Sequence, residues 1–201
     1  MAYSDFDLRT VREQFGLLLE EDTDLFATVH EVEVRERLRE VLEEWGPAAL
    51  AMNTEKARSE MIIAPVLMET VRLTRHRVSL FSGITFDVDR ARGLSGTCDF
   101  LLTKSPERFF LTHPVLAVVE AKKEDIPGGL GQCVAAMVAA QAFNEREGVS
   151  ATPVHGTVTT GSNWRFLKLE GNVVFIDRPE YYLHQVGKIL GILLSIADAK
   201  A

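Results

Sequence analysis

Residues 115–122 read VLAVVEAK, an apolar run that becomes charged only at its end. A short and nearly continuous apolar run is typical of a β-strand buried on both faces. Glu120 and Lys122 stand two residues apart, so on a strand their side chains point to the same face. Charges at the end of a buried strand cost free energy unless they are paired or bind a ligand. The run therefore predicts a site at the strand end or, as the alternative, a strand that runs out into a solvated loop.

The elements around this strand alternate between helix and strand patterns. The helix before it, over residues 53–73, is expected to kink or split at Pro65. A Gly-Gly-Leu-Gly stretch at 128–131 is expected to open the helix that follows, over 130–145. This order of elements predicts the α/β class, with a mixed central sheet covered by helices on both faces. The predicted strands span 79–88, 97–103, 115–122, 155–160, 166–169 and 173–176, and a closing helix spans 179–197.

Residues 1–50 differ from the rest of the chain in charge. They hold 13 acidic and 5 basic side chains, whereas residues 51–201 hold 16 acidic and 17 basic ones, and the net charge of the chain is −7. Apolar residues recur at helical spacing from Leu8 to Leu18 and again from Val34 to Trp45, and Gly46-Pro47 is expected to break or kink the second of these helices. We therefore expect a helical N-terminal extension over 1–50, available to a protein partner or to a second copy in a homodimer, and an α/β core over 51–201.

The composition places the chain among ordinary globular proteins, with 46% apolar and 25% charged residues. Cys98 and Cys133 lie in apolar stretches, which predicts reduced core thiols and a cytoplasmic location. A zinc site has no support, because no CxxC motif or Cys/His cluster is present. The chain begins without an apolar leader, and the apolar stretch 189–197 is far shorter than the roughly 20 residues of a membrane span. We expect no membrane segment.

Asp99 lies in the middle of the predicted strand 97–103, where aspartate is disfavoured. It could be an edge residue or a local hydrogen-bond acceptor. If the strand lies beside 115–122, however, Asp99 would face Glu120 and Lys122. A hard cation is then the partner that such a group of side chains suits, because Mg²⁺ is commonly held by one or two carboxylates and by water.

Two helical residues complete the set of unusual polar positions. Glu60 falls on an apolar face of the first core helix; alternatively, it is a rim residue that pairs with Lys56 one turn earlier. Gln132 is predicted in the first turn of the helix over 130–145, where free N–H groups suit an anionic ligand. A plain tight turn before that helix is the competing interpretation.

These polar residues follow one another on a helix, two strands and a helix, in an order that resembles the active site of the PD-(D/E)XK superfamily. They are Glu60, Asp99, Glu120-Ala121-Lys122 and Gln132. The superfamily includes restriction endonucleases, junction resolvases and RecB-like exonucleases, and the whole chain looks especially like its uncharacterised cyanobacterial-type members. The resemblance covers roughly residues 53–170 and implies a restriction endonuclease-like fold.

The resemblance implies a role for each of these positions. Asp99 and Glu120 would ligate one or two Mg²⁺ or Mn²⁺ ions, with the main-chain carbonyl of Ala121 completing the shell. Lys122 would orient or help to deprotonate the attacking water. Glu60 would reach an ion through a water molecule or hold a second cation. Gln132 matches a glutamine that some RecB-like members carry after the motif.

The implied function is a divalent-metal-dependent nuclease that hydrolyses phosphodiester bonds in DNA in preference to RNA. Two positions depart from the pattern of the superfamily. Cys98 replaces the proline before the aspartate, and Ala136 replaces a tyrosine of the RecB-like members, which argues against exonuclease action of that type. The alternative is a non-catalytic regulatory or protein-interaction module on the same fold, favoured by the acidic N-terminal segment and by the lack of a separate DNA-reading domain.

Overall fold

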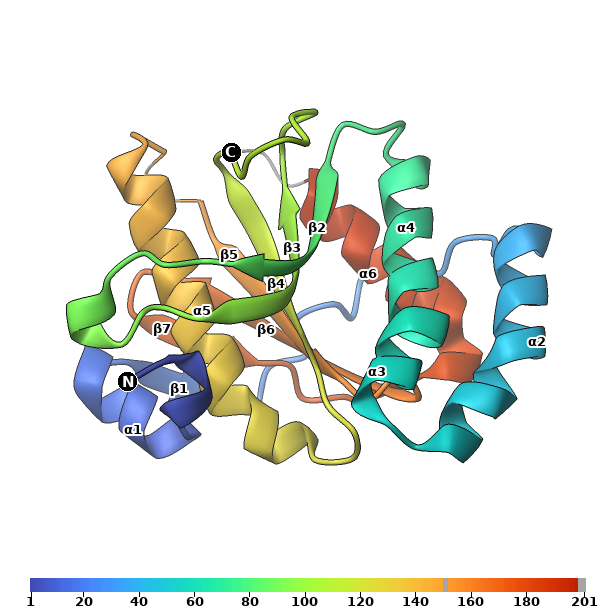
Figure 1. The fold of residues 1–201 in the computed structure, drawn as a ribbon, viewed down its shortest axis with the longest axis horizontal. Coiled ribbons are helices and arrows are strands. Elements are labelled where there is room, and N and C mark those ends of the chain that lie inside the picture. Colours follow the sequence, from blue (N-terminus) through green and yellow to red (C-terminus); the bar gives the residue numbers. More distant parts are fainter. Residues whose placement is uncertain (150–151, 199–201) are drawn as a thin grey trace.

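The computed structural model describes residues 1–149 and 152–198, which form one mixed β-sheet between helices (Figure 1). The strand order is β1-β7-β6-β5-β4-β3-β2, and β8 pairs with β6. β4 lies in the interior of the sheet, parallel to β5 and antiparallel to β3. The strands are β1 (Leu18–Glu20), β2 (Ser79–Thr85), β3 (Thr97–Thr103), β4 (Val115–Ala121), β5 (Val154–Thr159), β6 (Asn163–Glu170), β7 (Val173–Ile176) and β8 (Tyr181–Tyr182).

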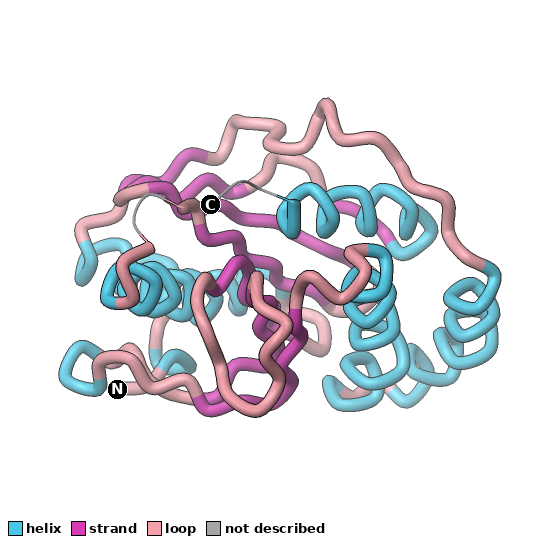
Figure 2. The backbone as a smooth tube through the Cα atoms, turned by 90° about the horizontal axis from the view of Figure 1, so that it is seen from above, coloured by secondary structure: helices cyan, strands magenta, loops and turns pink. Residues whose placement is uncertain are grey.

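Helices cover both faces of the sheet, which the view from above shows as three layers (Figure 2). α5 packs on β4 and β5 with α1 against it, and α4 and α6 pack together on the opposite face with α2 outside them. The predicted α/β class, with a mixed sheet flanked by helices, is confirmed. The helices are α1 (Leu8–Phe15), α2 (Glu36–Met52), α3 (Glu55–Arg58), α4 (Ala64–Leu73), α5 (Ile126–Arg146) and α6 (Val186–Asp198).

The central strand β4 is buried along its whole length. Val118 packs into the hydrophobic core between the sheet and α5, whereas its neighbour Val119 packs into the core on the other face. Burial on both faces explains why this strand is apolar at successive positions rather than at alternate ones. The main-chain N–H of Lys122 donates to the carbonyl oxygen of Thr159 at 2.8 Å. The pairing with β5 thus continues one residue beyond the strand and fixes the direction in which Lys122 leaves the sheet.

The helix predicted over 53–73 forms, and it is interrupted before Pro65. Thr54 caps its start through its side-chain hydroxyl, α3 follows, and a π-helical turn (Ser59–Ile63) separates α3 from α4. Proline has no N–H and its ring crowds the carbonyl one turn back, so the regular hydrogen-bond ladder cannot continue through it. Single π-helical turns inside helices are frequent at functional sites, and this one carries Glu60.

Residues 1–50 join the sheet and the core, so the prediction of a wholly helical extension is wrong. β1 pairs in parallel with β7, and Leu18, expected on a helix, belongs to this strand. Tyr3 and Phe6 are buried in the same core cluster as α5. A Cβ at Gly131 of α5 would overlap the carbonyl oxygen of Phe6. The N-terminal segment and α5 therefore touch backbone to backbone, which only a glycine permits.

Helix boundaries differ from the predictions in three places. α2 continues through Gly46-Pro47, where a break or kink was expected; Pro47 is exposed, so water can bond the carbonyl that loses its donor. α5 begins earlier than predicted, because Asp125 caps it by accepting the N–H of Gly128 at 2.9 Å. α6 begins later than predicted, because β8 and a 3₁₀ turn (Leu183–Gln185) precede it.

α5 is the principal helix of the core. Among the described residues it is the one helix long and apolar enough to cross a membrane, and most of it is buried against the rest of the protein. The core helix of a globular domain has the same length and composition. Cys133 on α5 and Cys98 on β3 are both free and buried, which confirms the prediction of core thiols.

Candidate active site

Strands β3 and β4 bring Asp99 and Glu120 together. Phe100 with Val119 is the last pair of the antiparallel register, and Asp99 and Glu120 are the next residues outward on the two strands, where their side chains interact. Residues directly opposite on antiparallel strands point to the same face with their Cβ atoms about 5 Å apart. Asp99 Oδ2 also accepts the main-chain N–H of Ala121 at 2.8 Å. The two carboxylates predicted as metal ligands thus lie side by side at the end of the central strand.

Glu120 is an acidic side chain held out of water, with 2% of its surface exposed. Burial, and then the charge of Asp99, raise the pKa of Glu120 to about 8, while the charge and hydrogen bond of Lys122 act in the opposite direction. Two adjacent carboxylates both ionise only at a cost unless a cation lies between them. The pair is therefore able to hold a proton near neutral pH or to exchange it for a cation.

Lys122 completes a polar cluster between β4 and α5. Its Nζ donates to Glu120 Oε1 at 2.8 Å and to Gln132 Oε1 at 3.0 Å. Burial lowers the pKa of Lys122, but the charge and hydrogen bond of Glu120 outweigh it, so the pKa is raised and the amine stays charged. A Cβ at Gly129 would lie 3.0 Å from Lys122 Cε and 2.7 Å from Val158 Cγ1. The glycine lets α5 pack close against the lysine side chain.

Gln132 contributes to the site through its side chain, whereas the prediction involved the free main-chain N–H groups of a first helical turn. α5 begins at Ile126, so Gln132 lies in its second turn, where the main-chain N–H is already bonded inside the helix. The prediction of a first-turn residue with a free N–H is therefore wrong. The side-chain oxygen of Gln132 instead accepts a hydrogen bond from Lys122. Its contribution to the site is to orient the ammonium group.

Glu60 borders the site without touching the carboxylate pair. It lines a cavity of about 290 Å³ that Asp99 and Ala121 also line. Glu60 Oε1 lies 3.1 Å from Lys56 Nζ, and 61% of the Glu60 side chain is exposed. The ion pair with Lys56 is the alternative that the helical spacing left open. The structure thus places Glu60 in the same cavity as Asp99.

Glu55 is a site residue that the sequence did not single out. It lines the same cavity as Asp99, and its charge contributes to the raised pKa of Lys122. In the sequence it is only an acidic residue in the first turn of a helix, a position that the helix dipole favours by itself. Nothing local distinguishes it, because its proximity to Lys122 arises from the packing of α3 against the strand end.

The donor set of the site consists of oxygen atoms. Within residues 1–149 and 152–198, no group of three or more His, Cys, Asp and Glu side chains is arranged to hold a metal ion. A cation at Asp99 and Glu120 would thus have two carboxylates from the protein. That number is usual for Mg²⁺, which keeps several waters in its shell.

Comparison with known proteins gives no relative for this chain. No family model, no curated protein and no solved structure matches it.

Proposed function

We propose that this chain is a Mg²⁺- or Mn²⁺-dependent nuclease with a restriction endonuclease-like core, and that it hydrolyses phosphodiester bonds in DNA. The observation that carries the proposal is the carboxylate pair Asp99 and Glu120, which lies beside the Lys122 ammonium at the end of β4. Buried ionisable groups that perturb one another occur mainly where a ligand or a reaction uses them. Without a ligand, burying these charges at a strand end would cost free energy, because water solvates them better.

The residues present fit a hard divalent cation. Asp99 and Glu120 offer oxygen atoms only, which suits Mg²⁺ and Mn²⁺ better than the softer transition metals. The repulsion between the two carboxylates, which contributes to the raised pKa of Glu120, is what a cation between them would relieve. The carbonyl of Ala121, at the same strand end, is a further oxygen ligand in this proposal.

The residues of the cluster have separate tasks in phosphodiester hydrolysis. Asp99 on β3 and Glu120 on β4 would hold the cation. A bound cation supplies Lewis acidity and lowers the pKa of water. The Lys122 ammonium orients the attacking water and stabilises the negative charge that develops around phosphorus. Gln132 fixes the direction of that ammonium, and Glu60 borders the substrate cavity as the accessory acid.

DNA is the proposed substrate on the strength of the resemblance. The charge distribution neither supports nor excludes a nucleic acid, because the acidic excess of the chain belongs to residues 1–50 and the remainder is nearly neutral. RNA has the same scissile group, so the test of the proposal includes it.

The test is a cleavage assay with supercoiled, linear and single-stranded DNA and with RNA, in Mg²⁺ and in Mn²⁺. The parent is compared with Asp99→Asn, Glu120→Gln and Lys122→Met, and with Glu13→Gln as the control. Glu13 is exposed on α1 and pairs with Arg9. We expect each site variant to lose about 100-fold or more of the rate and the control to keep it. Cleavage that persists in all three site variants would come from a contaminant and would defeat the proposal.

The second candidate is a non-catalytic regulatory or protein-interaction module on the same fold. It is favoured by Trp45 on α2, which is 46% exposed in the acidic N-terminal segment, since aromatic side chains are enriched at protein interfaces. Thermal unfolding in Mn²⁺ separates the candidates. Stabilisation of the parent that Glu120→Gln abolishes, combined with no cleavage of any substrate, would favour the module.

A further inference from the structure

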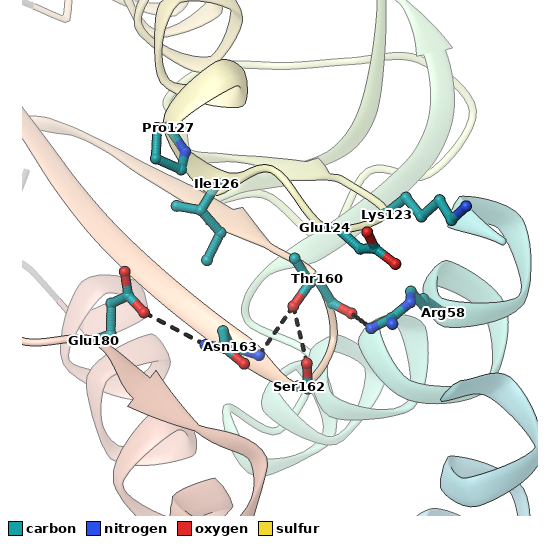
Figure 3. Close-up of a pocket in the computed structure, with 9 residues that line it drawn as sticks. All are labelled: Arg58, Lys123, Glu124, Ile126, Pro127, Thr160, Ser162, Asn163 and Glu180. Atoms are coloured by element: carbon teal, nitrogen blue, oxygen red, sulfur yellow. Dashed lines mark hydrogen bonds between the residues drawn. The ribbon is translucent and has the colours of Figure 1, made fainter. Parts of the chain in front are cut away.

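A second cavity of about 250 Å³ opens beside the carboxylate site. It lies between α3, the loop from β4 to α5, and the turn from β5 to β6 (Figure 3). Two cationic side chains, Arg58 and Lys123, line it, together with the polar side chains of Thr160, Ser162 and Asn163. We call it the cationic cavity.

We call the cavity of about 290 Å³ that Asp99 and Glu60 line the carboxylate cavity. It shares two chain segments with the cationic cavity. Arg58 lines the cationic cavity, while the next two residues, Ser59 and Glu60, line the carboxylate cavity. At the end of β4, Ala121 lines the carboxylate cavity and Lys123 lines the cationic one. The two cavities therefore adjoin the same helical segment and the same strand end.

Arg58 carries a buried charge without an acidic partner. It is 8% exposed. Its guanidinium donates to the carbonyl of Thr160 at 2.8 Å and to Asn53 Oδ1 at 3.0 Å, both of them neutral acceptors. Its Nε has no hydrogen-bond partner, and no ion pair of Arg58 is found in residues 1–149 and 152–198. A buried charge of this kind is costly unless an anion compensates it.

Two carboxylates also line the cationic cavity, and each has a hydrogen-bond partner. Glu124 Oε1 accepts from Asn53 Nδ2 at 2.7 Å, and Glu180 Oε1 accepts from Arg165 Nη2 at 2.7 Å. Lys123 is exposed, and in the described part of the chain its ammonium has no partner. Arg165 neutralises Glu180. The remaining charged side chains of the lining are Arg58, Lys123 and Glu124, so its net charge is positive.

The turn from β5 to β6 adds hydroxyl and amide groups to the wall. Thr160 and Ser162 share a hydrogen bond between their hydroxyls at 3.0 Å, and the N–H of Asn163 donates to Thr160 Oγ1 at 3.2 Å. Figure 3 shows these bonds as dashed lines, together with the bond from Arg58 to the carbonyl of Thr160. Serine, threonine and asparagine side chains together with Arg and Lys are the usual donors to phosphate oxygens.

We propose that the cationic cavity binds a phosphate group, namely the phosphate adjacent in a polynucleotide to the one at Asp99 and Glu120. The identity of the ligand as a polynucleotide rests on the proposed function, whereas the affinity for a phosphate group rests on the cavity alone. A second phosphate contact would set the register of the strand, because contacts to phosphates position a nucleic acid without reading its bases. Binding here would be independent of base sequence.

The experiment measures binding of a single-stranded oligothymidylate over a range of salt concentrations, in EDTA so that no cleavage occurs. The variants are Lys123→Gln and Ser162→Ala, and the control is Lys168→Gln, whose ammonium pairs with Glu170 on β6, away from the cavity. Loss of one phosphate contact reduces the slope of log K against log salt by about 0.7 for a single strand. We expect this reduction, with weaker binding, for Lys123→Gln, weaker binding for Ser162→Ala, and parental behaviour for the control.

Parental affinity and an unchanged salt slope in Lys123→Gln would overturn the inference. Because Lys123 is exposed, a folding defect would not explain weaker binding by this variant. Inorganic phosphate is the second probe. Binding of free phosphate that depends on Lys123, without binding of the oligothymidylate, would overturn the polynucleotide assignment. Failure of the proposed function gives a different result, namely binding of the oligothymidylate that depends on Lys123 with no cleavage in Mg²⁺ or Mn²⁺.

Discussion

The Glu120→Gln variant is expected to remove a large pH dependence from the stability of the metal-free protein. In the folded parent the pKa of Glu120 is about 8, against an ordinary value of 4.5. Between these pH values the folded protein keeps a proton that the unfolded chain has lost. The stability that this proton contributes is fully present below about pH 4.5 and is lost as the pH rises through about 8.

The magnitude follows from the difference between the two pKa values. Each unit of difference corresponds to about 1.4 kcal/mol, so the separation of 4.5 and about 8 corresponds to about 5 kcal/mol of unfolding free energy. Glutamine can still accept a hydrogen bond from Lys122 but does not titrate. The difference in stability between parent and variant should therefore shift by about 4 kcal/mol, in favour of the variant, between about pH 5 and about pH 9, which covers most of this range.

Urea unfolding at about pH 5, 7 and 9, followed by tryptophan fluorescence in EDTA, measures this difference. Glu13→Gln, which replaces an exposed carboxylate on α1, is the matched control and should track the parent at every pH. A constant difference between parent and Glu120→Gln across the three pH values would refute the reasoning. Mn²⁺ added at the alkaline pH should stabilise the parent and leave the variant unchanged.

Four further predictions concern other residues. Burial lowers the pKa of His155 to about 4 from its ordinary 6.5. The free energy of unfolding should therefore fall by roughly 3 kcal/mol as the pH drops from about 6.5 to about 4. Urea unfolding of His155→Gln should lack this fall. Gly131→Ala, which places a methyl group against backbone, should destabilise by about 1–3 kcal/mol in urea. Gly46→Ala, with open space around it, should stabilise by about 1 kcal/mol, and the opposite result for either glycine would contradict the packing argument. Gln132→Leu should lower the cleavage rate by about tenfold with little change in the urea midpoint, because it removes an acceptor from Lys122; an unchanged rate would exclude a positioning role.

The elements predicted with most accuracy are those whose local pattern has one physical solution. The strand over 97–103 has the predicted bounds, and the strand predicted over 115–122 ends one residue earlier. The interruption of the helix near Pro65 also follows from the chain alone, since proline cannot donate the required hydrogen bond. In each case the cause lies within a few residues of the effect.

The predictions that were wrong concern segments whose structure depends on distant partners. Leu18 fits a helical spacing, but β7 offers an unpaired edge, and pairing with it draws residues 18–20 into the sheet. Gln132 was placed in the first turn of its helix because the glycines before it favour a loop. The cap from Asp125 extends α5 over them, and close packing against Lys122 and Phe6 makes those glycines necessary inside the helix.

By itself the sequence determined the α/β class, the bounds of the central strands and the candidate acid and amine positions, because side-chain periodicity and the cost of burying charge act locally. Only the tertiary structure decided that Asp99 and Glu120 lie opposite each other, that Glu55 joins their cavity, and that Glu60 keeps its bond to Lys56. It also decided that Arg58 and Lys123 meet in one cavity. The physical reason is that strand register and helix packing depend on the burial of many side chains at once, which no short stretch of sequence records.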